Sequence, residues 1–390
     1  MSATVAGPGR TAAADGGRVT FAGDGGFYRA LKRRVHDDLR QAGLSAQDSP
    51  RLYLKTAVLL LWFGASYALL VFAAATFWQG ALLAGSLALA MAGIGFGVQH
   101  DANHGAYSRR GGVNRLMGAT LDLLGGSSYV WQWKHNIFHH TYPNLNGVDD
   151  DIDVGPFARL APEQPRYRPH RFQHIYVWAL YGFLGPKWQL LDDFKSLARA
   201  RIAGRPFPRP RGLSLLQVIG GKAIFVGWAF ALPLLFHPFW VVALFYVATA
   251  WLVGLVLGVV FQLAHCVEEA DFPAVPPGDR PVPGGWAVHQ VQTTVDFARR
   301  NRLLTWYVGG LNFQIEHHLF PRICHVHYPR ISAIVEAFCA ERGVRYAAHD
   351  GFLAAVRSHW RWLRRMGRPV GGRTGAAAAA APAPAAGSRP

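Results

Sequence analysis

Residues 131–153 read Trp-Gln-Trp-Lys-His-Asn-Ile-Phe-His-His-Thr-Tyr-Pro-Asn-Leu-Asn-Gly-Val-Asp-Asp-Asp-Ile-Asp and concentrate side chains that can bind a metal. On an α-helix His135 and His139 lie one turn apart on one face, with His140 beside them, so two or three imidazoles converge on one point. One such cluster is as typical of a polar surface patch as of a metal site. The metal interpretation therefore depends on ligands from elsewhere in the chain.

Two further histidine clusters supply such ligands. His100 and His104 repeat the one-turn spacing, and Gln314-Ile-Glu is followed by the adjacent pair His317 and His318. Three separate clusters favour a metal centre over chance. A rival pair, His170 and His174, also has one-turn spacing, but it lacks a third histidine and lies among arginines and aromatic residues, so we expect it to serve packing or headgroup contact.

Four long apolar blocks predict an integral membrane protein. The 390 residues are 51% hydrophobic and only 16% charged, and the apolar blocks are long enough, at roughly 20 residues each, to span a bilayer. We expect an all-α fold with four transmembrane helices in two hairpins, at about 56–78, 81–98, 213–236 and 239–263. The formal net charge of +17 then indicates an anionic membrane surface as partner, and no nucleic acid. Lys222 is a charged residue within a predicted span, and its side chain is expected to reach the headgroups near the end of its helix.

The basic residues predict the orientation of the hairpins. The expected turns Gln79-Gly80 and His237-Pro238 contain no Lys or Arg, and the other segments carry nearly all of them. By the positive-inside rule, both termini and every histidine cluster face the cytoplasm. The lone His265 follows the fourth span and comes to the same side, so a cytoplasmic helical cap holding one His-rich metal centre is feasible.

The two ends of the chain differ in composition from its middle. Residues 1–26 and 367–390 are small, polar or of low complexity and are expected to be disordered, which leaves 27–366 as one domain. Residues 27–42 mix apolar and basic side chains at helical spacing, which indicates either a helix on the membrane face or a plain surface helix. Three cysteines without Cys-x-x-Cys spacing support neither a disulfide framework nor a thiolate metal site.

The ligand type indicates a redox metal. Many imidazoles without thiolates suit iron, copper or zinc, and about eight ligands exceed the three or four that zinc needs, so two metals are the economical explanation. Asp101 and the acidic run at 149–153 could accept the second N–H of ligating imidazoles, although pairing with nearby arginines is an equally good explanation for any one of them.

The three clusters resemble the histidine boxes of the membrane fatty acid desaturase family over about residues 27–366. The first box corresponds to His100 and His104, and His265 matches the family's isolated histidine after the second hairpin. The other two boxes correspond to His135, His139, His140, Gln314, His317 and His318. The resemblance implies two Fe ions held by the eight histidines, dioxygen as co-substrate, and desaturation of a fatty acyl chain carried by coenzyme A or by a lipid in the cell's inner membrane.

Details of the resemblance imply a subgroup and an electron source. Gln314 in place of the third box's first histidine is similar to front-end, linoleoyl-CoA desaturase-like members, where it would be a ligand or a contact through water. The fused haem-carrying cytochrome domain of many such members has a His-Pro-Gly-Gly stretch, which this sequence lacks. Electrons would therefore come from a separate protein such as a ferredoxin.

Two alternatives remain at this stage. A hydroxylase or other oxygenase of the same superfamily would use the same ligands, and only product analysis separates it from a desaturase. A metal transporter or sensor would need polar residues within the spans, which are almost purely apolar. Aromatic side chains beside the boxes could line the mouth of an acyl tunnel or form an interfacial belt: Trp131, Trp133, Trp306 and Tyr307. Packing or hydrogen bonding is expected for His289, His325 and His327.

Overall fold

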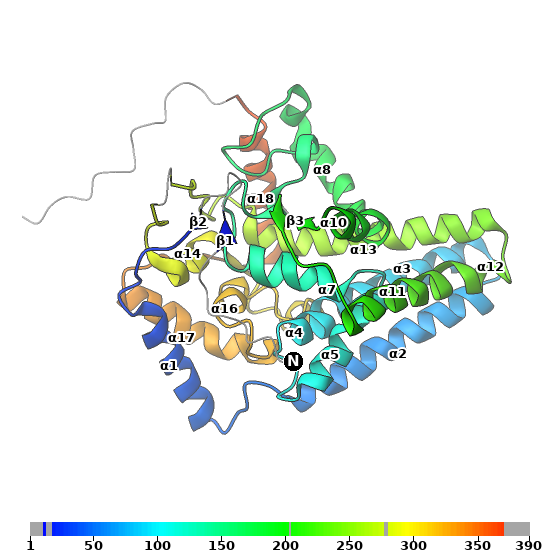
Figure 1. The fold of residues 1–390 in the computed structure, drawn as a ribbon, viewed down its shortest axis with the longest axis horizontal. Coiled ribbons are helices and arrows are strands. Elements are labelled where there is room, and N and C mark those ends of the chain that lie inside the picture. Colours follow the sequence, from blue (N-terminus) through cyan, green and yellow to red (C-terminus); the bar gives the residue numbers. More distant parts are fainter. Residues whose placement is uncertain (1–10, 13–17, 203, 277–279, 370–390) are drawn as a thin grey trace, which may run out of the picture.

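The chain folds into a bundle of long helices with a helical cap at one end. The computed structural model describes residues 11–12, 18–202, 204–276 and 280–369. Within these ranges, four helical segments are long and apolar enough to cross a membrane, at Pro50–Phe72, Phe77–Asn103, Leu213–Leu234 and Phe239–His265. They run side by side toward the right of Figure 1, and the remaining helices gather at their other end. The expected four spans in two hairpins are confirmed.

The first hairpin turns at a different place from the one expected. Helix α2 (Pro50–Phe72) ends before Ala73, and α3 (Phe77–Ile94) begins after Thr76, so the predicted turn at Gln79-Gly80 is wrong. The reason is a capping box: the Thr76 hydroxyl accepts from Gln79 N, and the Gln79 side chain accepts from Thr76 N. These two bonds satisfy amides that would otherwise be exposed at the helix start.

The second hairpin follows the predicted limits to within two residues. It comprises α11 (Leu213–Val226), the π-helix η7 (Gly227–Ala231), α12 (Leu232–Leu234) and α13 (Phe239–His265). His237 in its turn lies 2.7 Å, through Nε2, from the Val71 carbonyl oxygen at the end of α2. Both turns therefore lie at the end of the bundle remote from the histidine clusters.

Lys222 does not reach out to headgroups as expected. Its Nζ lies 2.7 Å from Asp193 Oδ2 and donates to the carbonyl oxygens of Gly125 and Gln189. The Lys222 and Asp193 side chains are only 11% and 1% exposed. An inward ion pair thus ties the third span to α10 (Asp193–Arg199) of the cap.

The cap wraps around the ends of the spans with short helices. Its elements are α1 (Phe27–Gln41), α4 (His100–Asn103), α5 (Gly111–Gly118), α6 (Thr120–Leu123), α7 (Ser128–Trp131), the π-helices η1 (Gly95–Gln99), η2 (Gln132–His139) and η6 (Trp188–Asp192), the 3-10 turns η3 (Asp150–Ile152), η4 (Gly155–Phe157), η5 (Arg168–Phe172) and η8 (His325–His327), and α8 (Gln173–Gly182), α9 (Leu184–Lys187), α14 (Gly285–Thr293), α15 (Arg302–Tyr307), α16 (Gln314–Leu319), α17 (Tyr328–Glu341) and α18 (Phe352–Met366). Two-residue strands pair as β1–β2 (Thr11–Ala12 with Arg18–Val19), β3–β4 (Arg201–Ile202 with Arg205–Pro206) and β5–β6 (Asp296–Phe297 with Ala348–His349).

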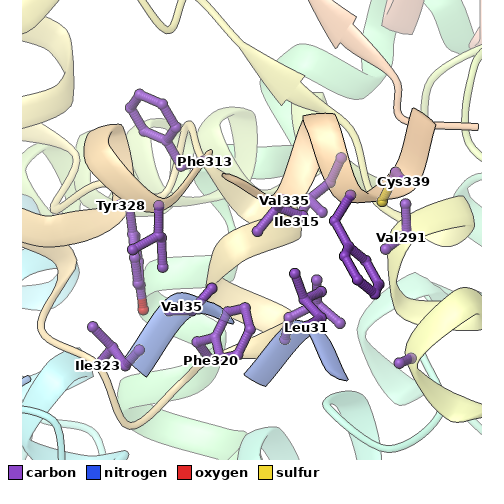
Figure 2. Close-up of a cluster of buried hydrophobic side chains, with 14 of the residues drawn as sticks. Leu31, Val35, Val291, Phe313, Ile315, Phe320, Ile323, Tyr328, Val335 and Cys339 are labelled. Carbon is purple, nitrogen blue, oxygen red and sulfur yellow. The ribbon is translucent and has the colours of Figure 1, made fainter. Parts of the chain in front are cut away.

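A buried apolar cluster joins α1 to the segment that carries the third histidine box. Figure 2 shows Leu31 and Val35 of α1 facing Ile315, Phe320 and other side chains from α14, α16 and α17. Burial of this α1 face against the cap, with Leu31 and Val35 both 0% exposed, favours the plain surface helix over the membrane-face alternative. The cluster fixes α16 in place through non-directional apolar contact.

Glycines allow α8 and α9 to lie unusually close to the fourth span. A Cβ on Gly254 would meet the Gly182 carbonyl oxygen at 2.4 Å and the Gly185 nitrogen at 2.5 Å. Because these neighbours are backbone atoms, only glycine fits the contact. The cap therefore rests directly on the backbone of α13.

The structure describes residues 11–12 and 18–26 of the predicted disordered lead. Val19 is buried, and Phe21 forms a β-bridge with Val282, so part of the predicted disordered lead packs on the cap. The apolar side chains at 19 and 21 explain the difference, because they find a buried partner far along the chain. Residues 1–10 and 13–17 of the predicted lead, and residues 370–390 of the predicted tail at 367–390, lie outside the described residues.

Candidate metal centre

The second histidine box lies on a π-helix instead of the expected α-helix. In η2 the His140 amide donates to the His135 carbonyl oxygen, five residues back. The wider turn brings the side chains of His135 and His140 together, with Nε2 atoms 3.2 Å apart. His139 consequently points to a different set of partners. One short segment thus contributes side chains to two sites. π-helical turns are frequent at functional sites.

The other histidines come from helix ends at the same level. The first box follows α3 through the π-helix η1 into α4, so His100 continues the second span. His265 is the last residue of α13, and His317 and His318 lie on α16. All eight histidines predicted as ligands are buried, and the fold brings them into one region of the cap.

Four histidines form the first cluster: His100, His104, His135 and His317. One potential ligand atom from each lies within 4.8 Å of the others. His140 joins them, because its Nε2 is 2.9 Å from His317 Nε2 as well as 3.2 Å from His135 Nε2. This geometry suits a single cation surrounded by imidazole nitrogens.

Three histidines form the second cluster: His139, His265 and His318. Their ligand atoms meet the same 4.8 Å criterion. His140 stacks on His318 with ring centroids 4.3 Å apart, so it lies between the two clusters. The arrangement offers two neighbouring metal positions, as the count of ligands predicts.

Many of the Nε2 atoms that face the clusters lack ordinary hydrogen-bond partners. His104 Nε2, His139 Nε2 and His318 Nε2 are buried with no protein partner among the described residues. The Nε2 atoms of His100, His135, His140 and His317 instead form a chain of short contacts. A ring nitrogen carries either one hydrogen or one in-plane lone pair, so such a chain is poorly satisfied by hydrogen bonds alone. The donor set therefore fits metal binding better than an internal polar network.

Burial keeps most of these imidazoles neutral. Desolvation, followed by repulsion from neighbouring imidazoles, lowers the pKa of His104, His140, His317 and His318 well below the ordinary value. Burial lowers the pKa of His139, but the nearby carboxylates of Asp149 and Asp151 together outweigh it, so the pKa is raised. Neutral imidazole is the form that binds metal.

Side chains around the clusters fix the orientation of the rings. Both carboxylate oxygens of Asp149 lie 3.1 Å from His139 Nδ1, as expected for a member of the acidic run. The Tyr328 hydroxyl lies 3.2 Å from His317 Nδ1, and the Gln290 amide group 2.9 Å from His318 Nδ1. Partners of this kind set the ring tautomer and strengthen ligation. Tyr328 and Gln290 were not predicted, since nothing in the local sequence marks them.

Gln314 and Asp101 occupy different positions relative to the clusters. Gln314 Nε2 lies 3.0 Å from His265 Nε2, so this residue borders the second cluster. Asp101 was expected to accept a hydrogen bond from a ligating imidazole. Among the described contacts, its Oδ2 instead accepts from His325 Nδ1 at 2.8 Å and from His325 N. The Nζ atom of Lys55 lies 3.1 Å from His325 Nε2. Although Asp101, Cys324 and His325 also satisfy a metal-like spacing, the adjacent ammonium group makes this cluster unsuited to a cation.

The remaining histidines stay outside the clusters. His170 Nε2 lies 2.8 Å from the Pro156 carbonyl oxygen, and the Tyr167 amide contacts its Nδ1. His174 packs edge-on to Trp360. His289 contacts the ring of Phe21, and His327 lies in the 3-10 turn η8. The rival metal pair therefore serves packing, as expected.

Of the four aromatic residues proposed for a tunnel mouth, Trp131 is the one with a ring contact to the clusters among the described residues. Trp131 stacks on His135 with ring centroids 4.3 Å apart and packs edge-on to His100 and His104. Trp133 packs near Phe207. Trp306 lies 5.5 Å from Lys55 Nζ, and Tyr307 donates to the Leu89 carbonyl oxygen.

Comparisons with known proteins agree with this geometry. Residues 76–350 match the family model described as fatty acid desaturase. The chain is 37% identical over 350 residues to a sn-1 linoleoyl-lipid 6-desaturase of Arthrospira platensis, covering 90% of this chain and 95% of the relative. It is 38% identical to the protein of the same description in Synechocystis sp., with 90% and 98% covered. An acyl-lipid (8-3)-desaturase of Physcomitrium patens is 38% identical, with 87% of this chain and 72% of the relative covered.

Proposed function

Because the chain belongs to the fatty acid desaturase family, a group of membrane oxidoreductases, we propose that it introduces a double bond into a lipid-bound acyl chain, between an existing double bond and the carboxyl end. The observation that carries this proposal is the pair of buried imidazole clusters at the ends of four apolar spans. Two of the relatives are linoleoyl-lipid 6-desaturases and one is an acyl-lipid (8-3)-desaturase, which supports the front-end, acyl-lipid form over an acyl-CoA substrate.

We infer that both clusters hold iron. The ligands would be His100, His104, His135 and His317 in the first cluster and His139, His265 and His318 in the second, with His140 between them. Gln314 would contact the second metal directly or through water. Imidazole sites without thiolates suit iron, and iron when bound would supply the activation of dioxygen that a C–H bond without nearby activating groups requires. The protein's own part is to exclude water, orient the rings and hold the chain.

A cavity between the spans supports an acyl substrate. It has a volume of about 340 Å³ and is lined mainly by apolar side chains of α2, α3, η7 and α13, among them Leu87, Met91, Trp228 and Phe245. Met91 precedes His100 by nine helical residues, which corresponds to about 14 Å of helix. The near end of the cavity is therefore placed to take the methyl end of a chain whose middle lies at the clusters.

Two further parts of the proposal concern the surroundings of the enzyme. The low content of basic residues in both hairpin turns supports a cytoplasmic position for the clusters and termini. A separate electron carrier such as a ferredoxin would supply the two electrons. The exposed Arg109, Arg110 and Arg115 follow the first box, and a surface of this charge favours an acidic carrier.

Lipid analysis of a heterologous host tests the proposed activity. Gas chromatography and mass spectrometry of host lipids should show a new double bond nearer the carboxyl end than the existing one. His317→Ala should abolish it, because His317 belongs to the first cluster. His170→Ala is the matched control, since His170 is equally buried but its hydrogen bonds go to backbone atoms outside the clusters, and its ring packs on Tyr167. A hydroxylated product would select the oxygenase alternative, and unchanged lipids with metal-loaded protein and a working reductant would refute the proposal.

A further inference from the structure

A single buried asparagine connects the supports of the second cluster. Asn144 lies in the loop after η2, is 0% exposed and has a left-handed φ of 59°. Its Nδ2 lies 3.0 Å from the carbonyl oxygens of His265 and Thr293 and 3.2 Å from that of Asp271. Since Nδ2 carries two hydrogens, one of them is shared. Asn144 thus joins the end of α13, the end of α14 and the loop between them.

Each histidine of the second cluster is reached from Asn144 through a short link. The Asn144 amide donates to Asp149 Oδ2 at 3.0 Å, and Asp149 contacts His139 Nδ1. His265 is held by its own carbonyl group.

The link to the third histidine runs through α14. The Thr293 carbonyl that Asn144 contacts ends this helix, and Gln290 of the same helix contacts His318 Nδ1. By contrast, the described contacts of Asn144 include no hydrogen bond to a residue of the first cluster.

We propose that Asn144 is a positioning residue for the second cluster alone, and that it sets the distance between His139, His265 and His318 at which they accept a metal. The inference rests on the proposed function only in that the two clusters are taken to hold metal. The left-handed backbone conformation of Asn144 makes this positioning role possible. It lets the amide nitrogen face Asp149 while the side chain faces the three carbonyl groups, a conformation that asparagine tolerates better than most residues.

Selective loss of one metal distinguishes positioning from general support. Asn144→Gly removes the side-chain donor and keeps the freedom to adopt positive φ. The metal content of the purified protein should fall to about half that of the unchanged protein, as it should in His139→Ala. Asn144→Asp should do the same, because it places a carboxylate against three carbonyl oxygens.

A second buried asparagine provides the matched control. Asn312 is also 0% exposed, and its Nδ2 holds the carbonyl groups of Phe297 and Ala298 and the Thr305 hydroxyl. Asn312→Gly should lower the thermal unfolding midpoint as Asn144→Gly does, yet keep the full metal content. Should Asn144→Gly fail to accumulate, Asn144→Ser carries the same expectation, because serine leaves the three carbonyl groups largely without a donor.

The possible results separate this proposal from the proposed function. Loss of nearly all metal, or full metal content, in Asn144→Gly overturns the positioning role. Full metal content in the unchanged protein without any double bond formed would overturn the proposed activity and leave the positioning role standing.

Discussion

Replacing Lys222 by methionine should destabilise the protein strongly and in a pH-dependent way. The change removes the cation that lies 2.7 Å from Asp193 Oδ2, and the Asp193 side chain is only 1% exposed. It also removes the donor to the carbonyl oxygens of Gly125 and Gln189. Breaking a buried ion pair from one side typically costs about 3–5 kcal/mol, because a charge is left buried without compensation. We expect a loss of this size near pH 8.

The pH dependence follows from the carboxyl group that remains. Burial raises the pKa of Asp193 to about 6, even though Lys222 lowers it. A carboxyl group with a raised pKa contributes stability below its unfolded pKa and loses that contribution as pH rises through its folded pKa. Without Lys222 the pKa of Asp193 rises further, so near pH 5 Asp193 is neutral and Lys222→Met should cost much less than near pH 8.

Thermal unfolding of purified protein in detergent, followed by tryptophan fluorescence, measures the effect at both pH values. The double variant Lys222→Met with Asp193→Leu should recover most of the stability near pH 8, because a well-packed apolar pair can replace a buried ion pair. The coupling between the two changes comes from comparing the double variant with each single one. Equal costs at the two pH values, or strictly additive effects, would refute the reasoning.

Three further predictions test separate parts of the structure. Thr76→Ala should reduce stability by about 1 kcal/mol through loss of the cap on α3, measured by thermal unfolding; an unchanged midpoint would contradict the capping box. Gly254→Ala should lower the free energy of unfolding by about 1–3 kcal/mol, because the added methyl group overpacks against the backbone of Gly182. Unchanged stability would show that α8 can move to make room for the methyl group. Met91→Trp should shift the lipid products toward shorter acyl chains. Val241→Trp, at the far end of the same cavity, should not. If both variants had the same effect, the cavity would not select the acyl chain by its length.

The long apolar blocks and histidine spacings made most of the fold and site predictable. Length and hydropathy alone locate the four spans, since the hydrocarbon core leaves few other structures available to such segments. The eight predicted histidines meet because both hairpins return the chain to the same end of the bundle. These signals are local, so a single sequence carries them.

The errors concern features that depend on competing hydrogen bonds or distant partners. The turn of the first hairpin was misplaced because the capping box at Thr76 outweighs the apolar run that continues past it. The π-helical turn at residues 132–139 has no sequence pattern that separates it from an α-helix. The contacts of Asn144 cannot be predicted from its local sequence, since its three carbonyl partners lie more than a hundred residues further along the chain.

The spread of the clusters along the chain has a consequence for biogenesis. His317 contacts His140 across 176 intervening positions, and the second hairpin lies between the first box and the third. During synthesis the spans therefore enter the membrane before the last ligands exist, and metal can be loaded only after nearly the whole cap has emerged. Until His317 and His318 have been made, neither cluster has its full set of imidazoles, so filling of the two clusters would be a late step in the assembly of the protein.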